Sequence, residues 1–194
     1  MVSKLPRITC IATFVLAAVS ATAHAEWSGT RARQERKVSV MAQTSWNGLS
    51  GSGFLVAVNP IPYVSLDLGG GFSTIGIKSG ARLRANLLPG SVSPFVGVGY
   101  FLGSGTGTDV LDTEDDGNEI NFRVLSSQFV QAIGGINWMT RGGFTLMGGA
   151  GWAWRTTDDP VSLISGTPNK NQKDAFDLLL ASGVVIELNV GYSF

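Results

Sequence analysis

Cysteine, histidine and charge are all scarce in this sequence. Its 194 residues include one cysteine, Cys10, and one histidine, His24, and only 14% are charged, against about 25% in typical soluble domains. No apolar run approaches the roughly 20 residues that a membrane-spanning helix requires. A thiol nucleophile and an imidazole base are therefore confined to the first 24 residues, and a helical membrane anchor is not predicted.

Residues 1–25 have the pattern of a secretory signal peptide. Lys4 and Arg7 precede the 13-residue apolar stretch 8–20, and small residues lead to an expected cleavage site after Ala25. An uncleaved anchor is the alternative, but 13 residues are short for a membrane span. The chain is therefore expected to be exported, and residues 26–35 to form a periplasmic lead-in.

Removal of this segment would restrict the available chemistry. The remaining chain would hold no cysteine for a disulfide and no histidine for acid–base catalysis. With Lys4 and Arg7 gone, the basic residues fall from 14 to 12 against 14 acidic ones, a net charge of −2. Without a basic patch, nucleic-acid binding is not expected. We expect no enzymatic activity and no cofactor.

After the leader, apolar and polar residues alternate with a period of two, the pattern of β-strands. Turn residues such as glycine and proline divide this pattern into eight candidate strands. The start of the last is open, because its register can be traced back to Phe176. The candidates are Lys37–Asn47, Ser52–Asn59, Tyr63–Ser73, Gly80–Leu88, Pro94–Gly103, Phe122–Met139, Phe144–Arg155 and Val184–Phe194.

The connections between these strands differ in length. Links two, four and six are short turns, whereas long links occur near 104–121 and 156–176, both of odd number and so at the same end. Short turns at one end and long loops at the other are typical of outer-membrane barrels. We therefore predict an all-β protein, an eight-stranded antiparallel up-and-down transmembrane β-barrel over residues 36–194.

The two faces of the strands indicate which side meets lipid. The polar face is rich in small residues that fit a narrow lumen, and aromatic residues gather at strand ends as two belts about 25 Å apart. A soluble lipocalin-like barrel would also alternate, with its apolar face inward. The belts comprise Trp46, Phe54, Phe72, Trp152 and Trp154 at the outer-loop end and Tyr63, Trp138, Phe144, Tyr192 and Phe194 at the turn end.

Five charged residues fall on the polar face and form the candidate lumen network. Asp67 and Arg84 are expected as direct or diagonal neighbours in one hairpin. Unpaired charges in a narrow interior cost several kcal/mol, so we expect ion pairs that close the lumen; a small-solute or ion channel is the alternative. The five are Asp67, Arg82, Arg84, Arg123 and Glu187.

The acidic segment 112–117, DTEDDG, begins like a calcium-binding loop. Such a loop needs a bidentate glutamate at its twelfth position, where this chain has Arg123. A metal site is therefore not predicted, and the segment is read as a solvated acidic loop.

The leader, the eight strands and the final residues resemble the small bacterial outer-membrane β-barrels related to the membrane domain of outer membrane protein A and its virulence-associated relatives. The most specific part is the ending, Val190, Tyr192 and Phe194, which resembles the signal that the outer-membrane assembly machinery reads in that family. No appended peptidoglycan-binding domain is recognised.

This resemblance implies a location and a set of partners. The location is the bacterial outer membrane, with outer-membrane lipids, lipopolysaccharide and the assembly machinery as partners. The implied role is structural, or contact with an extracellular ligand through the long loops, on a closed lumen. The alternatives are a small-solute or ion channel and a soluble lipocalin-like binding protein.

Overall fold

The computed structural model is an all-β protein. It describes residues 32–106, 108–111, 120–157, 161–165 and 182–194. One short helix, α2 (Ala32–Glu35), precedes the strands. The strands are β1 (Val38–Trp46), β2 (Ser52–Ile61), β3 (Val64–Ser73), β4 (Gly76–Asn86), β5 (Val92–Gly103), β6 (Thr108–Leu111), β7 (Ile120–Val124), β8 (Ser127–Met139), β9 (Phe144–Arg155), β10 (Val161–Ser165) and β11 (Gly183–Ser193).

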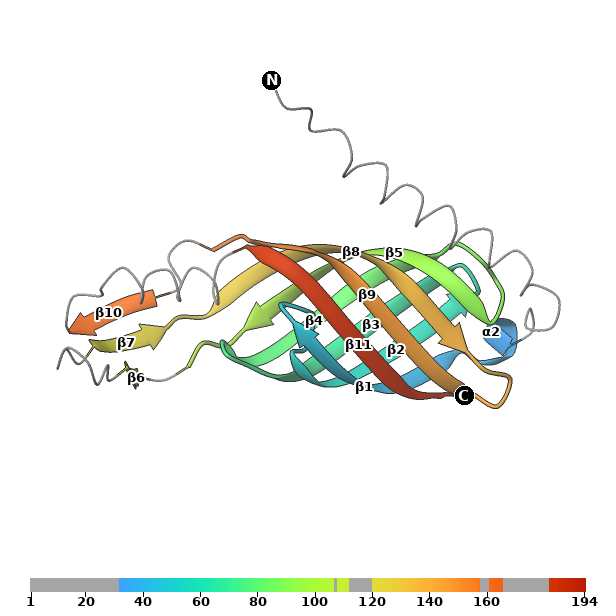
Figure 1. Ribbon diagram of the computed structural model, residues 1–194, viewed down its shortest axis with the longest axis horizontal. Coiled ribbons are helices and arrows are strands. Elements are labelled where there is room, and N and C mark those ends of the chain that lie inside the picture. The colour runs from blue at the N-terminus through green and yellow to red at the C-terminus, as the bar shows by residue number, and fades with distance from the viewer. Residues whose placement is uncertain (1–31, 107, 112–119, 158–160, 166–181) are drawn as a thin grey trace, which may run out of the picture.

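Eight of these strands close into an antiparallel barrel (Figure 1). The order around the ring is β1-β11-β9-β8-β5-β4-β3-β2. The ring closes where β1 pairs with β11, from Ser39 opposite Ser193 to Trp46 opposite Ile186. Closure satisfies the backbone groups of both edge strands, and the predicted eight-stranded barrel is thereby confirmed.

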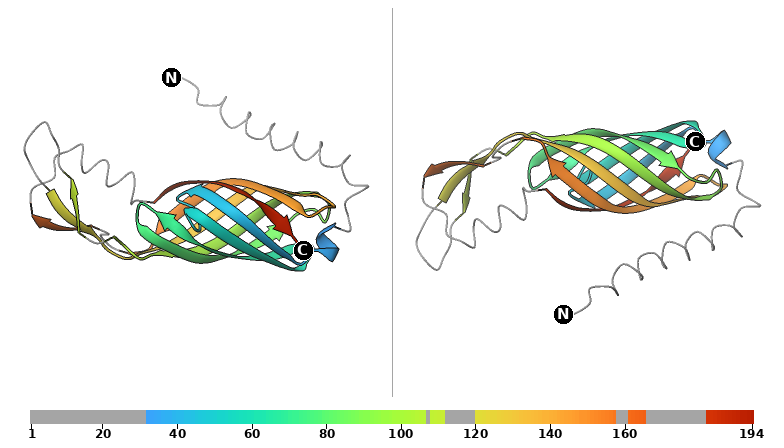
Figure 2. Two further views of the ribbon diagram at one scale, coloured as in Figure 1. Left: turned by 90° about the horizontal axis from the view of Figure 1, so that it is seen from below. Right: turned by 90° about the horizontal axis from the view of Figure 1, so that it is seen from above.

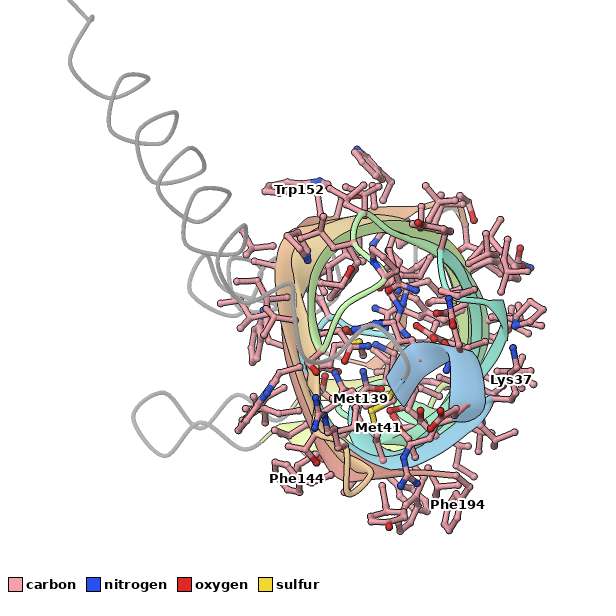
Figure 3. All side chains as sticks on the ribbon, turned by 90° about the vertical axis from the view of Figure 1, so that its right-hand side faces the viewer. Lys37, Met41, Met139, Phe144, Trp152 and Phe194 are labelled. Atoms are coloured by element: carbon pink, nitrogen blue, oxygen red, sulfur yellow. The ribbon has the colours of Figure 1, made fainter. Side chains whose placement is uncertain are left out.

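Side chains alternate strictly between the two faces of the wall. On β11, Val185, Glu187 and Asn189 are buried in the interior, whereas Ile186 and Leu188 are exposed on the outside. The view along the barrel in Figure 3 shows the same division. Met41 and Met139 lie within the ring, and Phe144, Trp152 and Phe194 point away from it. The outward positions of Phe144 and Trp152 and the inward position of Glu187 agree with the prediction from the period-two pattern.

The remaining three strands form a second sheet, in the order β10-β7-β6. This sheet projects beyond one end of the barrel, whereas α2 lies at the opposite end (Figures 1 and 2). Its strands come from the long links between β5 and β8 and between β9 and β11. The end with the second sheet is called the loop end below, and the end with α2 the turn end.

The predicted sixth strand, 122–139, is wrong at its beginning. Residues Ile120–Val124 form β7 of the second sheet, and β8 of the barrel begins only at Ser127. The backbone leaves the strand conformation at residues 125 and 126. The alternation is irregular from Val124 to Gln128 and becomes regular again from Val130, so the sequence pattern did not show where the barrel strand begins.

The barrel strands also extend past several predicted ends. Strand β4 begins at Gly76 rather than at residue 80, and β2 continues through Pro60 to Ile61 with a shift in register. The β1–β2 link is a tight reversal in which Asn47 and Gly51 have positive φ angles of 51° and 66°, a conformation that asparagine and glycine tolerate best.

No helix in the described residues is long and apolar enough to cross a membrane.

Candidate functional site

A cluster of charged side chains occupies the middle of the barrel interior. Asp67 on β3 faces Arg82 on β4 directly, and Arg84 is its diagonal neighbour. Arg84 donates from Nη2 to Asp67 Oδ1 at 2.9 Å and from Nε to Oδ2 at 3.1 Å, while Arg82 Nε donates to Oδ2 at 2.9 Å. The carboxylate thus receives a bidentate pair and one further charged hydrogen bond, a strong arrangement for planar guanidinium groups.

Arg82 also reaches across the barrel. Its Nη1 donates to Oε1 of Glu187 at 2.7 Å. Strand β11 lies four places from β4 around the ring of eight, directly opposite. The ion pair therefore spans the lumen at its middle rather than lining one wall.

Polar neighbours hold Glu187 in this position. Gln43 Nε2 on β1 donates to Oε2 at 3.1 Å, and Asn189 Nδ2 donates to Oε1 at 3.4 Å. Ser50, in the β1–β2 link, donates in turn to Gln43 Oε1. On the other side, the Arg84 guanidinium lies 5.0 Å from the centre of the Phe95 ring, within the range of a cation–π contact. These contacts therefore join five strands, β1, β3, β4, β5 and β11, and the β1–β2 link.

Several polar atoms of this network lack a partner among the described protein groups. These buried atoms without a hydrogen-bond partner are Arg82 Nη2, Arg84 Nη1 and both polar atoms of the side chain of the neighbouring Gln131 on β8. Buried polar atoms without protein partners usually bind internal water. We therefore expect a hydrated lumen around a fixed ionic bridge.

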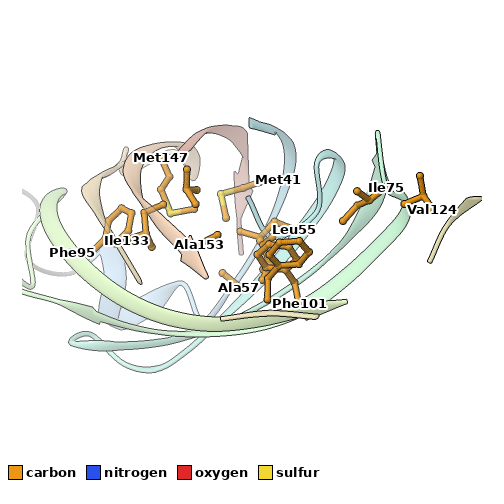
Figure 4. Close-up of a cluster of buried hydrophobic side chains, with 13 residues drawn as sticks. Met41, Leu55, Ala57, Ile75, Phe95, Phe101, Val124, Ile133, Met147 and Ala153 are labelled. Atoms are coloured by element: carbon orange, nitrogen blue, oxygen red, sulfur yellow. The ribbon is translucent and has the colours of Figure 1, made fainter. Parts of the chain in front are cut away.

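Figure 4 shows the buried apolar side chains of the interior. Those around Phe101 and Leu49 form a layer on the loop-end side of the charge cluster, because they pack at the level of Gly80, two residues before Arg82 on β4. Phe101 and Phe129 stack with ring centres 4.8 Å apart, and Leu55 and Leu49 are fully buried. Leu49 comes from the β1–β2 link, which therefore folds into the barrel. A Cβ at Gly80 would lie 2.9 Å from Cδ1 of Leu49, so glycine there makes room for this side chain. No sequence pattern indicated the burial of Leu49, because a residue in a link between strands does not take part in the alternation.

The turn end is closed by α2. Arg33 is fully buried; its Nε donates to the carbonyl oxygen of Gly90 at 3.0 Å and its Nη2 to that of Asn137 at 3.2 Å. Burial, with a smaller contribution from the charge of Arg84, lowers the pKa of Arg33 to about 10, so the side chain remains protonated at neutral pH. The lead-in predicted for residues 26–35 thus includes an ordered helix whose arginine caps the barrel, and residues 26–31 lie outside the described range.

The structure separates one predicted lumen residue from the rest. Asp67, Arg82, Arg84 and Glu187 meet in the cluster described above, but Arg123 is exposed on β7 of the second sheet. The assignment of Arg123 to the lumen is wrong, because it depended on residues 122–124 belonging to a barrel strand. The acidic segment 112–117 lies outside the described residues, as do the leader 1–25 and Phe176.

The predicted belt residues all point outward. Trp46, Phe72, Trp152 and Trp154 are exposed near the loop ends of their strands, and Trp138 and Phe144 are exposed near the turn end. Trp138 and Phe144 make an edge contact with ring centres 6.0 Å apart. Val190, Tyr192 and Phe194 are likewise exposed on the outer face. Two groups of aromatic side chains therefore lie on the outer face, one near each end of the barrel.

Comparison with known proteins shows that no protein-family model and no curated protein matches this chain. The described residues contain no cluster of three or more histidine, cysteine, aspartate or glutamate side chains that could hold a metal ion.

Proposed function

We propose that this chain is an integral β-barrel protein of a bacterial outer membrane with a closed lumen and a structural or surface-contact role. This proposal agrees with the resemblance to the small outer-membrane barrels described above. It includes the outer-membrane assembly machinery, lipids and lipopolysaccharide as partners, and it assigns no catalytic activity.

The inverted distribution of polarity carries the proposal. The interior holds two carboxylates and three arginines, whereas the outer wall exposes valine, leucine, isoleucine and aromatic side chains on every strand of the barrel. Ile186, for example, is 59% exposed and its neighbour Glu187 only 3%. Monomeric soluble proteins rarely expose contiguous apolar patches larger than a few hundred Å², but a lipid bilayer requires such a band.

The aromatic residues support the same orientation. Tryptophan and tyrosine favour the interface between lipid and water because one part of each side chain is apolar and another can donate a hydrogen bond. The two groups described above lie towards opposite strand ends, the arrangement of interfacial girdles in membrane barrels.

A soluble lipocalin-like binder is the second candidate, and the interior argues against it. A lipocalin-like barrel keeps apolar side chains around an internal ligand space, but here the ionic cluster crosses the interior. A hollow of about 550 Å³ lies elsewhere, over β4, β5 and β8. Outward residues such as Leu83, Val96, Val98 and Ala132 line it, so an acyl chain of the bilayer would fill it.

A channel is the third candidate, and two features of the lumen disfavour it. The Arg82–Glu187 pair spans the middle, and the apolar layer around Leu49 and Phe101 covers its loop-end side. Ions passing this route would have to break a buried ion pair and cross an apolar layer. We therefore place any contact with other molecules at the loop end, where the second sheet extends beyond the barrel.

Cell fractionation with a gel-mobility assay tests the proposal. The full-length chain should fractionate with the outer membrane, and the folded barrel should migrate differently in an unboiled sample than after boiling. Recovery in the soluble periplasmic fraction, with release of a bound apolar ligand on unfolding, would favour the lipocalin-like alternative and refute the membrane proposal.

A further inference from the structure

We propose that Lys78 forms the centre of a small-anion site at the loop end of the barrel, with a phosphate group as its ligand. Lys78 lies on the inward face of β4, two residues after the strand begins at Gly76. The ligand would enter from the loop end, on the far side of the apolar layer from the charge cluster.

The first observation is a buried cation without a counter-charge. Lys78 is only 2% exposed, and among the described residues it forms no hydrogen bond or ion pair. Among the described residues, its charge is met by a cation–π contact with the Phe101 ring, whose centre lies 4.0 Å from Nζ. A cation–π contact contributes about 0.5–2 kcal/mol, whereas burying an ammonium group costs several kcal/mol. An anion beside Nζ would compensate this cost.

The interior carboxylates Asp67 and Glu187 do not form an ion pair with Lys78. On the inward face of β4, Gly80 lies between Lys78 and Arg82, and a Cβ added at Gly80 would meet Leu49 and Phe101. These apolar side chains therefore occupy the level between Lys78 and the cluster. Asp67 and Glu187 are in turn bound by Arg82 and Arg84.

The charge balance of the buried groups agrees with a missing anion. Among the residues that the structure describes, the buried ionisable side chains are four cations, Arg33, Lys78, Arg82 and Arg84, and two carboxylates, Asp67 and Glu187. Arg33 has two carbonyl acceptors at the turn end. Of these described side chains, Lys78 is the one at the loop end whose charge has no counter-ion.

The second observation is a hollow of about 200 Å³ beside Lys78. It lies between the β1–β2 link and the β3–β4 link and is lined by Ser45, Asn47, Ser52, Ser73, Thr74 and Lys78. The Ser73 hydroxyl accepts the Ile75 amide at 3.3 Å, which leaves its own hydrogen available to a ligand oxygen. Hydroxyl donors around an ammonium group suit an oxyanion with several acceptor oxygens.

The size of the hollow limits the ligand. A water molecule takes about 30 Å³ in the liquid, so 200 Å³ accommodates one phosphate group but not a peptide or a lipid tail. Trp46 and Phe72, two aromatic residues of the loop-end belt, also line this hollow. Free phosphate and the phosphate of a lipid headgroup are therefore the two sources to be distinguished, and only the lipid source depends on the proposed membrane location.

Thermal unfolding of the full chain, folded in an uncharged detergent, tests the site. The variant Lys78→Met keeps a long side chain against the Phe101 ring but removes the charge. Lys37→Met is the matched control, because Lys37 is exposed next to β1 at the turn end. Inorganic phosphate is titrated against sodium chloride of equal ionic strength.

We expect phosphate to raise the unfolding midpoint of the wild type and of Lys37→Met by a few degrees with a saturable dependence. Lys78→Met should show no phosphate dependence, and in chloride alone it should unfold at the same or a higher temperature than the wild type. An equal phosphate response in Lys78→Met and the wild type, or no response in either, would overturn the proposal.

Vesicles of phosphatidylglycerol distinguish the source of the phosphate. If the headgroup fills the site, free phosphate will have no further effect on the wild type there, although it acts in uncharged detergent. If free phosphate is the ligand, its effect will persist in vesicles. Because the detergent titration needs only a folded barrel, a failed anion site and a failed membrane assignment give different results.

Discussion

Arg82 and Glu187 form an ion pair across the barrel, with 2.7 Å between Nη1 and Oε1, although their strands β4 and β11 lie on opposite sides of the ring. Both side chains are fully buried, and Arg82 is also bound to Asp67. An eight-stranded barrel has an interior that side chains can just fill. In this protein two long side chains from facing walls meet at its middle.

Substitution of Glu187 by glutamine should strongly destabilise the barrel. Glutamine keeps the shape of the side chain but removes one of the two carboxylates that bind Arg82, so that Asp67 alone faces two arginines; breaking one partner of a buried ion pair typically costs about 3–5 kcal/mol. The free energy of unfolding in urea, measured in lipid vesicles, gives the loss.

A double-mutant cycle separates the pair from its surroundings. Arg82→Met, Glu187→Met and the double variant should show a coupling energy of about 0.5–3 kcal/mol, the range for residues in contact. Additive losses would mean that the two side chains do not interact in the folded protein.

The closed lumen predicts an electrically silent protein. In planar bilayers the wild type should show no steady conductance, and Arg84→Ala should remain silent because the Arg82–Glu187 bridge and the apolar layer around Leu49 persist. A steady wild-type conductance that changes in Arg84→Ala would contradict the closed lumen and favour the channel.

Two adjacent glycines on β8 should respond differently to alanine. A Cβ at Gly135 would enter the interior, meeting the carbonyl oxygen of Gly148 and lying 2.8 Å from Cζ of Phe95, whereas at Gly134 its nearest neighbour is the Phe95 carbonyl oxygen at 3.6 Å. We expect Gly135→Ala to lose about 1–3 kcal/mol through overpacking. Gly134→Ala should be neutral or gain up to about 1 kcal/mol. Equal effects in denaturant unfolding would argue against the assigned faces.

Arg33→Ala should loosen the turn end of the barrel. Hydrogen bonds from a charged group contribute about 1.5–3 kcal/mol, and Arg33 donates two, to Gly90 and Asn137. Hydrogen exchange at nearby backbone amides such as Met139, which donates to Ser91, should become faster. Gln34→Ala, an exposed change on the same helix, is the control and should leave exchange unchanged.

The effect of Arg33→Ala should also be independent of pH below about 10. Burial lowers the pKa of Arg33 to about 10, so its charge costs folding energy at lower pH and this cost disappears only as pH rises through that value. The same acceleration of exchange at pH 6 and pH 9, after correction for intrinsic rates, is the expected result. A strong difference in this acceleration between pH 6 and pH 9 would mean that the titration of another group controls the hydrogen bonds of Arg33.

The barrel itself was predictable because alternation is a direct consequence of strand geometry. With a period of two, Val184 to Phe194 fixed which residues face outward and which inward, and the same pattern brought Asp67 and Arg84 to one face. The ends of the strands were less predictable, because turns such as the Pro60–Ile61 region can continue a strand with a register shift.

The missed residues share a physical reason. Leu49 and Arg33 lie in segments without alternation. They are buried because the link and the helix that carry them lie at the two open ends of the barrel. Lys78 was omitted because the predicted strand began at residue 80. Arg123 was misplaced because alternation does not show where a strand leaves the barrel wall for another sheet. Tertiary closure, rather than local pattern, decides all four positions.

Fluorescence quenching by brominated lipids tests most directly whether the outer wall meets lipid. Trp46, Trp138, Trp152 and Trp154 all point outward, and bromine on the acyl chains quenches tryptophan only on contact. The refolded chain in vesicles of brominated phosphatidylcholine should lose most of its tryptophan emission relative to ordinary vesicles, more strongly with bromine near the headgroup than at the chain end. Equal emission in brominated and ordinary lipid would contradict a lipid-facing barrel.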